Sequence, residues 1–283
     1  MDQHTLETVM TMHQFETHEP VDLYVEIDKG RIHVTAQETN ETTVEVAGRD
    51  ADEVVVEQSG TRISVIAPRR RGGFFSGDSD MRVSIVLPTG SDVTSRTGSA
   101  DLLVDGTIGS CHAKTGSGDL AVDHVSGPSQ LESGSGDVTL NHVSDALRVK
   151  SGSGDIAVRH SEGAIAVSTG SGDVEIGDSG GVTVVKTGSG DLQVGEARTD
   201  VSLATGSGDL AIGCARNGKV TVKGASGDVR VGIPAGVPVW TDITTVSGSI
   251  HSDLEGAGQP QDGQDHIELR AKTVSGDITL KQL

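Results

Sequence analysis

The sequence has almost no aromatic side chains. Phe, Trp and Tyr make up 2% of its 283 residues, and hydrophobic residues of all kinds make up only 34%. A chain with so few bulky side chains cannot fill one large spherical core, yet its regular alternation of apolar and polar residues is not typical of a disordered chain. We therefore expect a thin, elongated core.

Long apolar runs and positive charge are also scarce. No stretch approaches the roughly 20 apolar residues of a membrane span, and residues 1–20 lack the basic and apolar segments of a secretory signal. The formal net charge is −19, since 41 Asp and Glu outnumber 22 Lys and Arg. This charge argues against binding to nucleic acid or to an anionic membrane surface. We expect a cytoplasmic protein that binds no nucleic acid and does not insert into a membrane.

Only two cysteines are present, Cys111 and Cys214, in repeats that are six apart. Stacked repeats rise by about 4.8 Å each, which separates the two thiols by far more than a disulfide can bridge. We predict two separate thiols, which suit a reducing cytoplasm.

Glycine, in contrast, is abundant, and it recurs in one short phrase. The phrase TGSGD or SGSGD returns every eighteen residues and ends at Asp119, Asp137, Asp155, Asp173, Asp191 and Asp209. A fixed short period is the signature of a repeat architecture, in which each unit buries its apolar face by stacking on the next.

Each repeat carries two pairs of apolar residues. They lie one and three positions after the Asp, as at Leu192 and Val194, and ten and twelve positions after it, as at Val201 and Leu203. Two strands that share one narrow interior explain this spacing. The left-handed helix of hexapeptide repeats, which also has eighteen residues per coil, would place apolar residues at every sixth position. The column seven positions after the Asp is polar instead, which excludes that fold. We predict an all-β, right-handed parallel β-solenoid (β-helix) with 18-residue coils and irregular β caps at both ends.

The flanking segments are less regular. We expect residues 1–92 to form an irregular β region that caps the solenoid, and residues 93–283 to form the solenoid with irregular C-terminal coils. The two regions should form one continuous domain. The prolines before Val239 limit the next strand to a sheet edge. We expect the only Trp, Trp240, to cover the last apolar layer, and residues 267–280 to complete the final coils.

Stacking turns sequence positions into columns of side chains. We expect the repeated Asp to accept hydrogen bonds from N–H and Ser hydroxyl groups of its own Gly-Ser-Gly turn, although a calcium site remains an alternative because the phrase partly matches the GGxGxDxUx calcium repeat. A Ser/Thr column, from Ser133 to Thr205, should point inward and close the turn with its hydroxyl groups.

A second polar column lies five positions after the Asp. Its members are metal-ligand types: His124, His142, His160, Asp178, Glu196 and Cys214. Imidazoles in register could hold zinc. The alternative is that these are polar turn positions that accept any hydrophilic side chain. The first five residues are therefore no more than candidate metal ligands.

One basic cluster interrupts the acidic chain. It comprises Arg69, Arg70, Arg71, Phe74 and Phe75. It is a candidate interaction loop for an acidic partner or another copy, or a loop that packs on the end of the solenoid.

Recognisable catalytic motifs are missing. We find no GxSxG, P-loop or HExxH sequence and expect no catalytic residue and no cofactor. Polysaccharide-cleaving β-helix enzymes do use clustered carboxylates, which leaves a carbohydrate-active enzyme as an alternative, but turns this short cannot wall a cleft.

The opening VDLYVEIDKGRIHVTA, the serial SGSGDV and TGSGDL phrases, and the closing IHSDLEGAGQP and IELRAKTVSGDITL resemble the bacterial adhesin-like β-strand-repeat family of unknown function. The resemblance spans nearly the whole chain and implies a β-solenoid without defined catalytic residues. We expect a non-enzymatic scaffold or protein-interaction surface that binds a protein partner or self-associates. The alternatives are a metal- or calcium-binding solenoid and a carbohydrate-active enzyme.

Overall fold

The protein is built almost entirely from β-strands. The computed structural model describes residues 9–68, 81–256, 258, 260 and 264–283. These residues form 27 strands and a single 3-10 turn, η1 (Ala51–Glu53). Within these ranges no helix has the length and apolar character that a membrane crossing requires. The predicted all-β class is confirmed.

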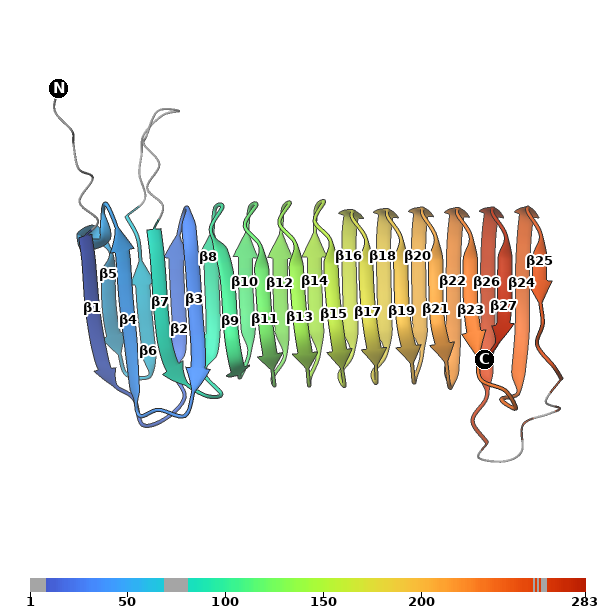
Figure 1. The fold of residues 1–283 in the computed structure, drawn as a ribbon, viewed down its shortest axis with the longest axis horizontal. Coiled ribbons are helices and arrows are strands. Elements are labelled where there is room, and N and C mark those ends of the chain that lie inside the picture. The colour runs from blue at the N-terminus through green and yellow to red at the C-terminus, as the bar shows by residue number, and fades with distance from the viewer. Residues whose placement is uncertain (1–8, 69–80, 257, 259, 261–263) are drawn as a thin grey trace, which may run out of the picture. The chain divides into compact units, whose positions relative to one another are not determined.

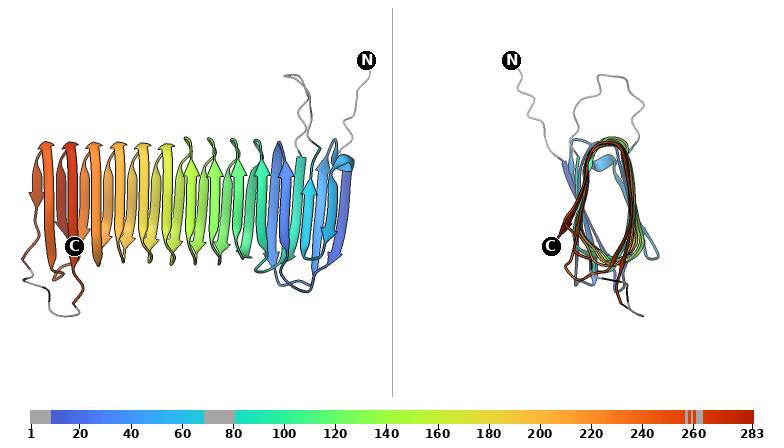
Figure 2. Two further views of the ribbon diagram at one scale, coloured as in Figure 1. Left: turned by 180° about the vertical axis from the view of Figure 1, so that it is seen from behind. Right: turned by 90° about the vertical axis from the view of Figure 1, so that its right-hand side faces the viewer.

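The chain divides into two compact units, Met1–Thr139 and Leu140–Leu283. The boundary falls inside β13 (Val138–Val143). Unit 1 is coloured from blue to green in Figure 1, and unit 2 continues to red. Each unit contains strands of two sheets, and in the end-on view of Figure 2 the two sheets of unit 2 lie on opposite sides of a narrow interior.

Unit 1 combines irregular strands with the first regular repeats. Its first sheet has the order β1 (Val9–Glu16), β4 (Glu41–Gly48), β7 (Met81–Pro88), β3 (Gly30–Gln37), β9 (Asp101–Ile108) and β11 (Leu120–Val125). Its second sheet has the order β12 (Ser129–Ser133), β10 (Cys111–Thr115), β8 (Asp92–Thr97), β2 (Asp22–Ile27), β6 (Arg62–Ile66) and β5 (Val55–Ser59).

Unit 2 contains the most regular strands. Its first sheet has the order β15 (Ile156–Ser161), β17 (Val174–Ser179), β19 (Leu192–Ala197), β21 (Leu210–Ala215), β23 (Val229–Ile233), β27 (Ile278–Gln282) and β25 (Ile250–Ser252). Its second sheet has the order β14 (Leu147–Ser151), β16 (Ile165–Ser171), β18 (Thr183–Ser189), β20 (Val201–Ser207), β22 (Gly218–Ser226), β26 (Ile267–Ser275) and β24 (Val239–Ser247).

Alternation of apolar and polar residues places one face of every regular strand inside. In β19, Leu192 and Val194 are each 1% exposed. Leu192 pairs with Val174 on one side and with Leu210 on the other, so like residues of successive repeats lie side by side. All the strands in this series are parallel. The two strands expected in each repeat are present, one in each sheet.

The first strands of the chain do not follow their sequence order in space. The turn after Ile27 joins β2 to β3, which lie in different sheets, so the two strands begin a coil and do not form a hairpin. β3 pairs with β9 as well as with β7, and β4 and β1 continue the sheet beyond β7 with antiparallel pairing. The irregular strands of residues 41–88 therefore lie outside the first coil.

The C-terminal strands are also rearranged. β26 lies between β22 and β24, and β27 lies between β23 and β25. The expectation that residues 267–280 form the final coil is therefore wrong, because β24 and β25 lie beyond them. Burial of the inward side chains explains this order. Ile267 and Leu269 of β26 are fully buried, whereas the prolines before Val239 suit β24 to a sheet edge. Trp240 does not cover the apolar layer, because it is 54% exposed.

Candidate functional site

The repeat phrase forms two ladders that are structural. The Ser/Thr column points inward as predicted, and its hydroxyl groups donate to carbonyl oxygens of the adjoining turn. Ser133 Oγ lies 2.7 Å from the Gly136 oxygen, and Thr187 Oγ1 lies 2.8 Å from the Ser189 oxygen. Thr187 is only 8% exposed. These hydroxyl groups close the turns and are not presented as nucleophiles.

The Asp column links successive repeats. Oδ1 of Asp155 accepts a hydrogen bond of 2.8 Å from the N–H of Asp173, eighteen residues on. Asp173 and Asp191 do the same for the next repeat, each at 2.8 Å. The prediction of backbone N–H donors is correct, but the donor belongs to the next repeat and not to the aspartate's own turn. One oxygen of each of these carboxylates is thus engaged in holding the stack.

A polar column follows the outer face of the first sheet in unit 2, as the spacing predicts. His160 in β15 pairs in register with Asp178 in β17, Asp178 with Glu196 in β19, and Glu196 with Cys214 in β21. The column exists because each strand is in register with the next.

The column brings two imidazoles together. The ring centroids of His142, in β13, and His160 are 4.9 Å apart, and the ring planes are tilted by 32°. Both side chains are about one-third exposed. Nδ1 of His160 lies 3.6 Å from Oδ2 of Asp178. His160 therefore contacts two other candidate residues of the column, His142 on one side and Asp178 on the other.

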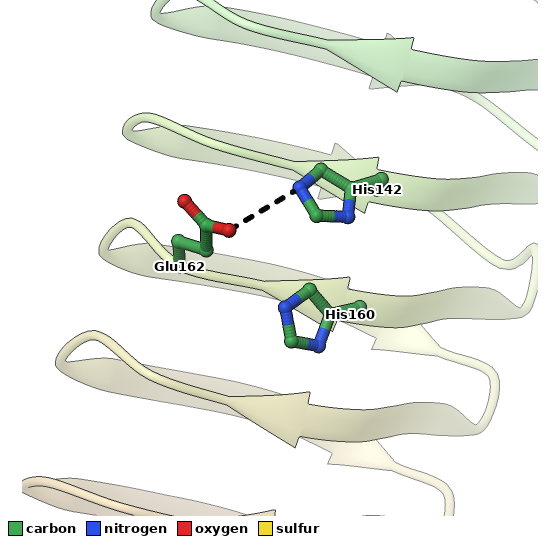
Figure 3. A group of neighbouring side chains, drawn as sticks. All are labelled: His142, His160 and Glu162. Atoms are coloured by element: carbon green, nitrogen blue, oxygen red, sulfur yellow. Dashed lines mark ion pairs between the residues drawn. The ribbon is translucent and has the colours of Figure 1, made fainter.

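Glu162 completes the cluster, and sequence reasoning missed it. It follows β15, and its carboxylate Oε1 lies 3.6 Å from Nε2 of His142 (Figure 3). Its backbone N–H donates to the carbonyl of Val143, next to His142, at 2.9 Å. Glu162 belongs to the column seven positions after the Asp, which we compared only with the hexapeptide fold. Glu162 lies two residues after His160, and residues two apart in an extended segment share a face; this offset was the signal that could have identified it.

One donor atom from each of His142, His160 and Glu162 lies within 4.8 Å of the other two. Among the residues that the structure describes, these three form the group whose donors come close enough together to hold a metal ion. We call them the His142 cluster. Imidazole nitrogens and a carboxylate oxygen are ligands that zinc accepts.

Glu196 has a different role from the one proposed. It lies 2.8 Å from Nε of Arg198 and 2.9 Å from Nε of Arg216. Hydrogen bonds from Arg216 and then Arg198 lower the pKa of this carboxyl to about 2. A carboxylate held between two guanidinium groups is a surface ion pair and is not available to a cation.

The remaining candidates lie elsewhere. His124 belongs to unit 1, where its Nδ1 lies 3.3 Å from Oγ1 of Thr107. The interaction-loop candidates Arg69, Arg70, Arg71, Phe74 and Phe75 lie outside the described residues. Both cysteines are free thiols, as predicted.

The C-terminal end of unit 2 exposes apolar side chains. β24 and β25 are the last strands of their sheets among the described residues. Val246 is 79% exposed and Ile250 is 48% exposed. We call β24, β25 and these side chains the C-terminal edge. An open strand edge with apolar side chains is a template for pairing with another chain.

Solved structures resemble the chain only distantly. A candidate adhesin from Bacteroides fragilis is 13% identical, with 97% of each chain covered and a TM-score of 0.42. A candidate lipid-binding protein from Parabacteroides distasonis is 14% identical, with 97% of this chain and 96% of that chain covered and a TM-score of 0.34. A candidate cell adhesion protein from Clostridium sporogenes is 11% identical, with 98% of this chain and 100% of that chain covered and a TM-score of 0.26. No curated protein matches the chain significantly.

A family profile gives the firmer assignment. The Toastrack DUF4097 profile matches residues 22–183 and again residues 179–281. The two matches together cover most of the sequence, including both the irregular strands and the repeats, and they confirm the resemblance to an adhesin-like family of unknown function. The chain belongs to the Toastrack DUF4097 family.

Proposed function

We propose that this protein is a non-enzymatic, adhesin-like scaffold whose C-terminal edge binds a second copy of the chain. In this proposal the fold is a right-handed parallel β-solenoid of 18-residue coils, capped by residues 1–92 and continued by residues 93–283. Hydrogen bonds between residues eighteen apart support the coil length, and the general preference of parallel crossovers supports the hand.

The C-terminal edge carries the proposal. β24 pairs with β26 through parallel hydrogen bonds, and no described strand pairs with its other side. Ile243 faces the same side as Ala271, which is buried, yet Ile243 itself is only half-buried. The interior of the stack is therefore incompletely covered at this end.

A second copy is the partner that fits this edge best. Two identical edges can pair antiparallel about a two-fold axis, and the two-fold dimer is the commonest closed assembly. Covering a half-exposed Ile or Val contributes about 1 kcal/mol, on a scale of roughly 1.5–3 kcal/mol for complete burial. Backbone hydrogen bonds along nine residues of β24 would add to this.

Light scattering coupled to size-exclusion chromatography tests the proposal. The 29.1 kDa chain should elute at twice its monomer mass at micromolar concentrations. Ile243→Lys places a charge on the open edge, a device that natural edge strands use against pairing, and should give a monomer. Val182→Lys, at a side chain that is 49% exposed and distant from β24 in the strand order, is the control. A wild-type monomer, or an unchanged dimer in Ile243→Lys, would refute the assignment of the interface.

Two further parts of the proposal concern location and the basic loop. Two free thiols support residence in the reducing cytoplasm, and cell fractionation would test it. Residues Arg69 to Arg71 remain a candidate docking site for an acidic protein partner. Replacing all three with Ala should abolish the recovery of such a partner while the dimer mass stays unchanged.

A further inference from the structure

We propose that the His142 cluster binds one divalent transition-metal ion of the zinc type, with His142, His160 and Glu162 as ligands and Asp178 as the residue that positions His160. The site lies within unit 2, and it does not depend on the proposed dimer. It would give the scaffold a metal-dependent link between neighbouring strands.

The distances are those of a site that closes around an ion. Zinc binds imidazole nitrogen and carboxylate oxygen at about 2.0–2.2 Å, so tetrahedral donors lie about 3.4 Å apart. The three donor atoms here lie within 4.8 Å of one another, and Nε2 of His142 is already 3.6 Å from Oε1 of Glu162. Movements of about 1 Å bring all three into range.

Those movements need only side-chain rotations. The backbones that carry the ligands are fixed, because His160 is part of the parallel ladder and the N–H of Glu162 is bonded to the carbonyl of Val143. The side chain of Glu162 is 62% exposed, and those of His142 and His160 are about one-third exposed. Figure 3 shows both imidazole rings turned toward the side on which Glu162 lies.

The neighbouring carboxylate selects the coordinating nitrogen of His160. Oδ2 of Asp178 lies 3.6 Å from Nδ1 of His160. This contact is longer than a hydrogen bond, and a small rotation of Asp178 would let its carboxylate accept a hydrogen bond from Nδ1–H, which leaves Nε2 to coordinate the ion. Histidines that bind metals generally donate their other ring N–H to a carboxylate or carbonyl in this way, which fixes the tautomer and the ring orientation. His142 faces Glu162 through the same atom, Nε2.

The ligand set selects the class of metal. Two imidazoles and one carboxylate suit Zn²⁺, Co²⁺ or Ni²⁺, whereas Ca²⁺ and Mg²⁺ prefer oxygen ligands alone. Three protein ligands leave the fourth tetrahedral position to water. The ion also offsets the negative charge of Glu162 and Asp178, in a chain whose net charge is −19.

Cobalt titration tests the site directly. Co²⁺ should bind the untagged full-length protein at one equivalent and produce the visible absorption of a tetrahedral cobalt centre, and one equivalent of Zn²⁺ should abolish that absorption. Millimolar Ca²⁺ or Mg²⁺ should not. Isothermal titration calorimetry with Zn²⁺ then gives the affinity, and circular dichroism shows that each variant remains folded.

Four variants and one control locate the ion. His142→Gln, His160→Gln and Glu162→Gln should each weaken zinc binding by at least 100-fold, and Asp178→Asn should weaken it by about 10- to 100-fold, as loss of a positioning partner does. His112→Gln, an exposed histidine of β10, is the control and should bind normally. If a histidine variant fails to fold, Glu162→Gln and Asp178→Asn still test the site.

Two results would overturn the proposal. One is the absence of tetrahedral cobalt absorption in the wild type. The other is zinc binding that survives the change of both His142 and His160, because the ion would then be held elsewhere. Repeating the titration with Ile243→Lys separates the two proposals: a metal site that persists in the monomer stands even if the dimer interface is wrong.

Discussion

The ladder of aspartates in unit 2 can be tested at Asp191. Its Oδ1 accepts the N–H of Asp209 at 2.8 Å, and its own N–H donates to Asp173 at 2.8 Å. Asp191→Ala removes only the first of these bonds, because the second uses the backbone. Asp191→Asn keeps an oxygen at the same position and removes the negative charge.

The two changes have different expected energies. A hydrogen bond from N–H to a charged acceptor contributes about 1.5–3 kcal/mol, and one to a neutral acceptor about 0.5–1.5 kcal/mol. Carboxylates spaced by about 4.8 Å along a sheet repel by about 1 kcal/mol per neighbour in water. Asp191 has two such neighbours, Asp173 and Asp209. Relief of about 2 kcal/mol of repulsion therefore offsets most of the lost bond, and Asp191→Ala should destabilise by about 0–1 kcal/mol at low salt. Asp191→Asn should be neutral or slightly stabilising.

Urea unfolding followed by circular dichroism measures both changes, as shifts of the midpoint at constant slope. Glu175→Gln, on the exposed face of β17, removes one negative charge outside the ladder and is the control. Sodium chloride at about 1 M shortens the screening length to about 3 Å, so any advantage of Asp191→Asn should disappear there. Equal losses in the Ala and Asn variants, or no loss in Asp191→Ala at about 1 M sodium chloride, where the repulsion is screened, would show that the bond to Asp209 does not support the stack.

Three further predictions concern single side chains. Gly190→Ala should destabilise by about 1–3 kcal/mol, because Gly190 has φ +131° and an added Cβ would lie 2.2 Å from the Gly172 oxygen. Gly256→Ala, where an added Cβ meets no atom of the described residues within 4 Å, should leave the urea midpoint unchanged. The stability that Glu196 gains from its arginines is complete above pH about 4.5 and is lost as the pH falls toward its folded pKa of about 2. In Glu196→Gln the free energy of unfolding should therefore depend less on pH in that window, and an unchanged pH profile would count against the ion pair. Burial raises the pKa of the Cys111 thiol to about 12, so a thiol reagent should label the partly exposed Cys214 first. Equal labelling rates of the two thiols would be inconsistent with the burial of Cys111.

Much of the fold follows from local patterns. The alternation around Leu192 and Val201 gives strands with one apolar face, and the inward Ser/Thr column follows from the same parity. The five-residue offset from the Asp correctly places His160, Asp178 and Glu196 in one column, because parallel strands in register keep equal offsets together.

Contacts between columns do not follow from offsets within one column. Glu162 joins His142 through the backbone bond to Val143, and Arg216 joins Glu196 from the following repeat. Both depend on which strand lies next to which, and on how far a side chain reaches across that gap. The partner of Asp191, the N–H of Asp209, lies in the same column, but the repeat period does not tell whether this N–H or a donor of the aspartate's own turn lies nearer to the carboxylate.

The sequence by itself determined the strands, their inward faces and the repeat period, because these depend on side-chain alternation over a few residues. The tertiary structure alone decided the order of the strands at each end, where β26 lies inside β24 and β3 lies next to β9. That order depends on which segment buries its apolar face more completely against the repeats. It is a competition between segments distant in sequence, and local periodicity carries no information about its outcome.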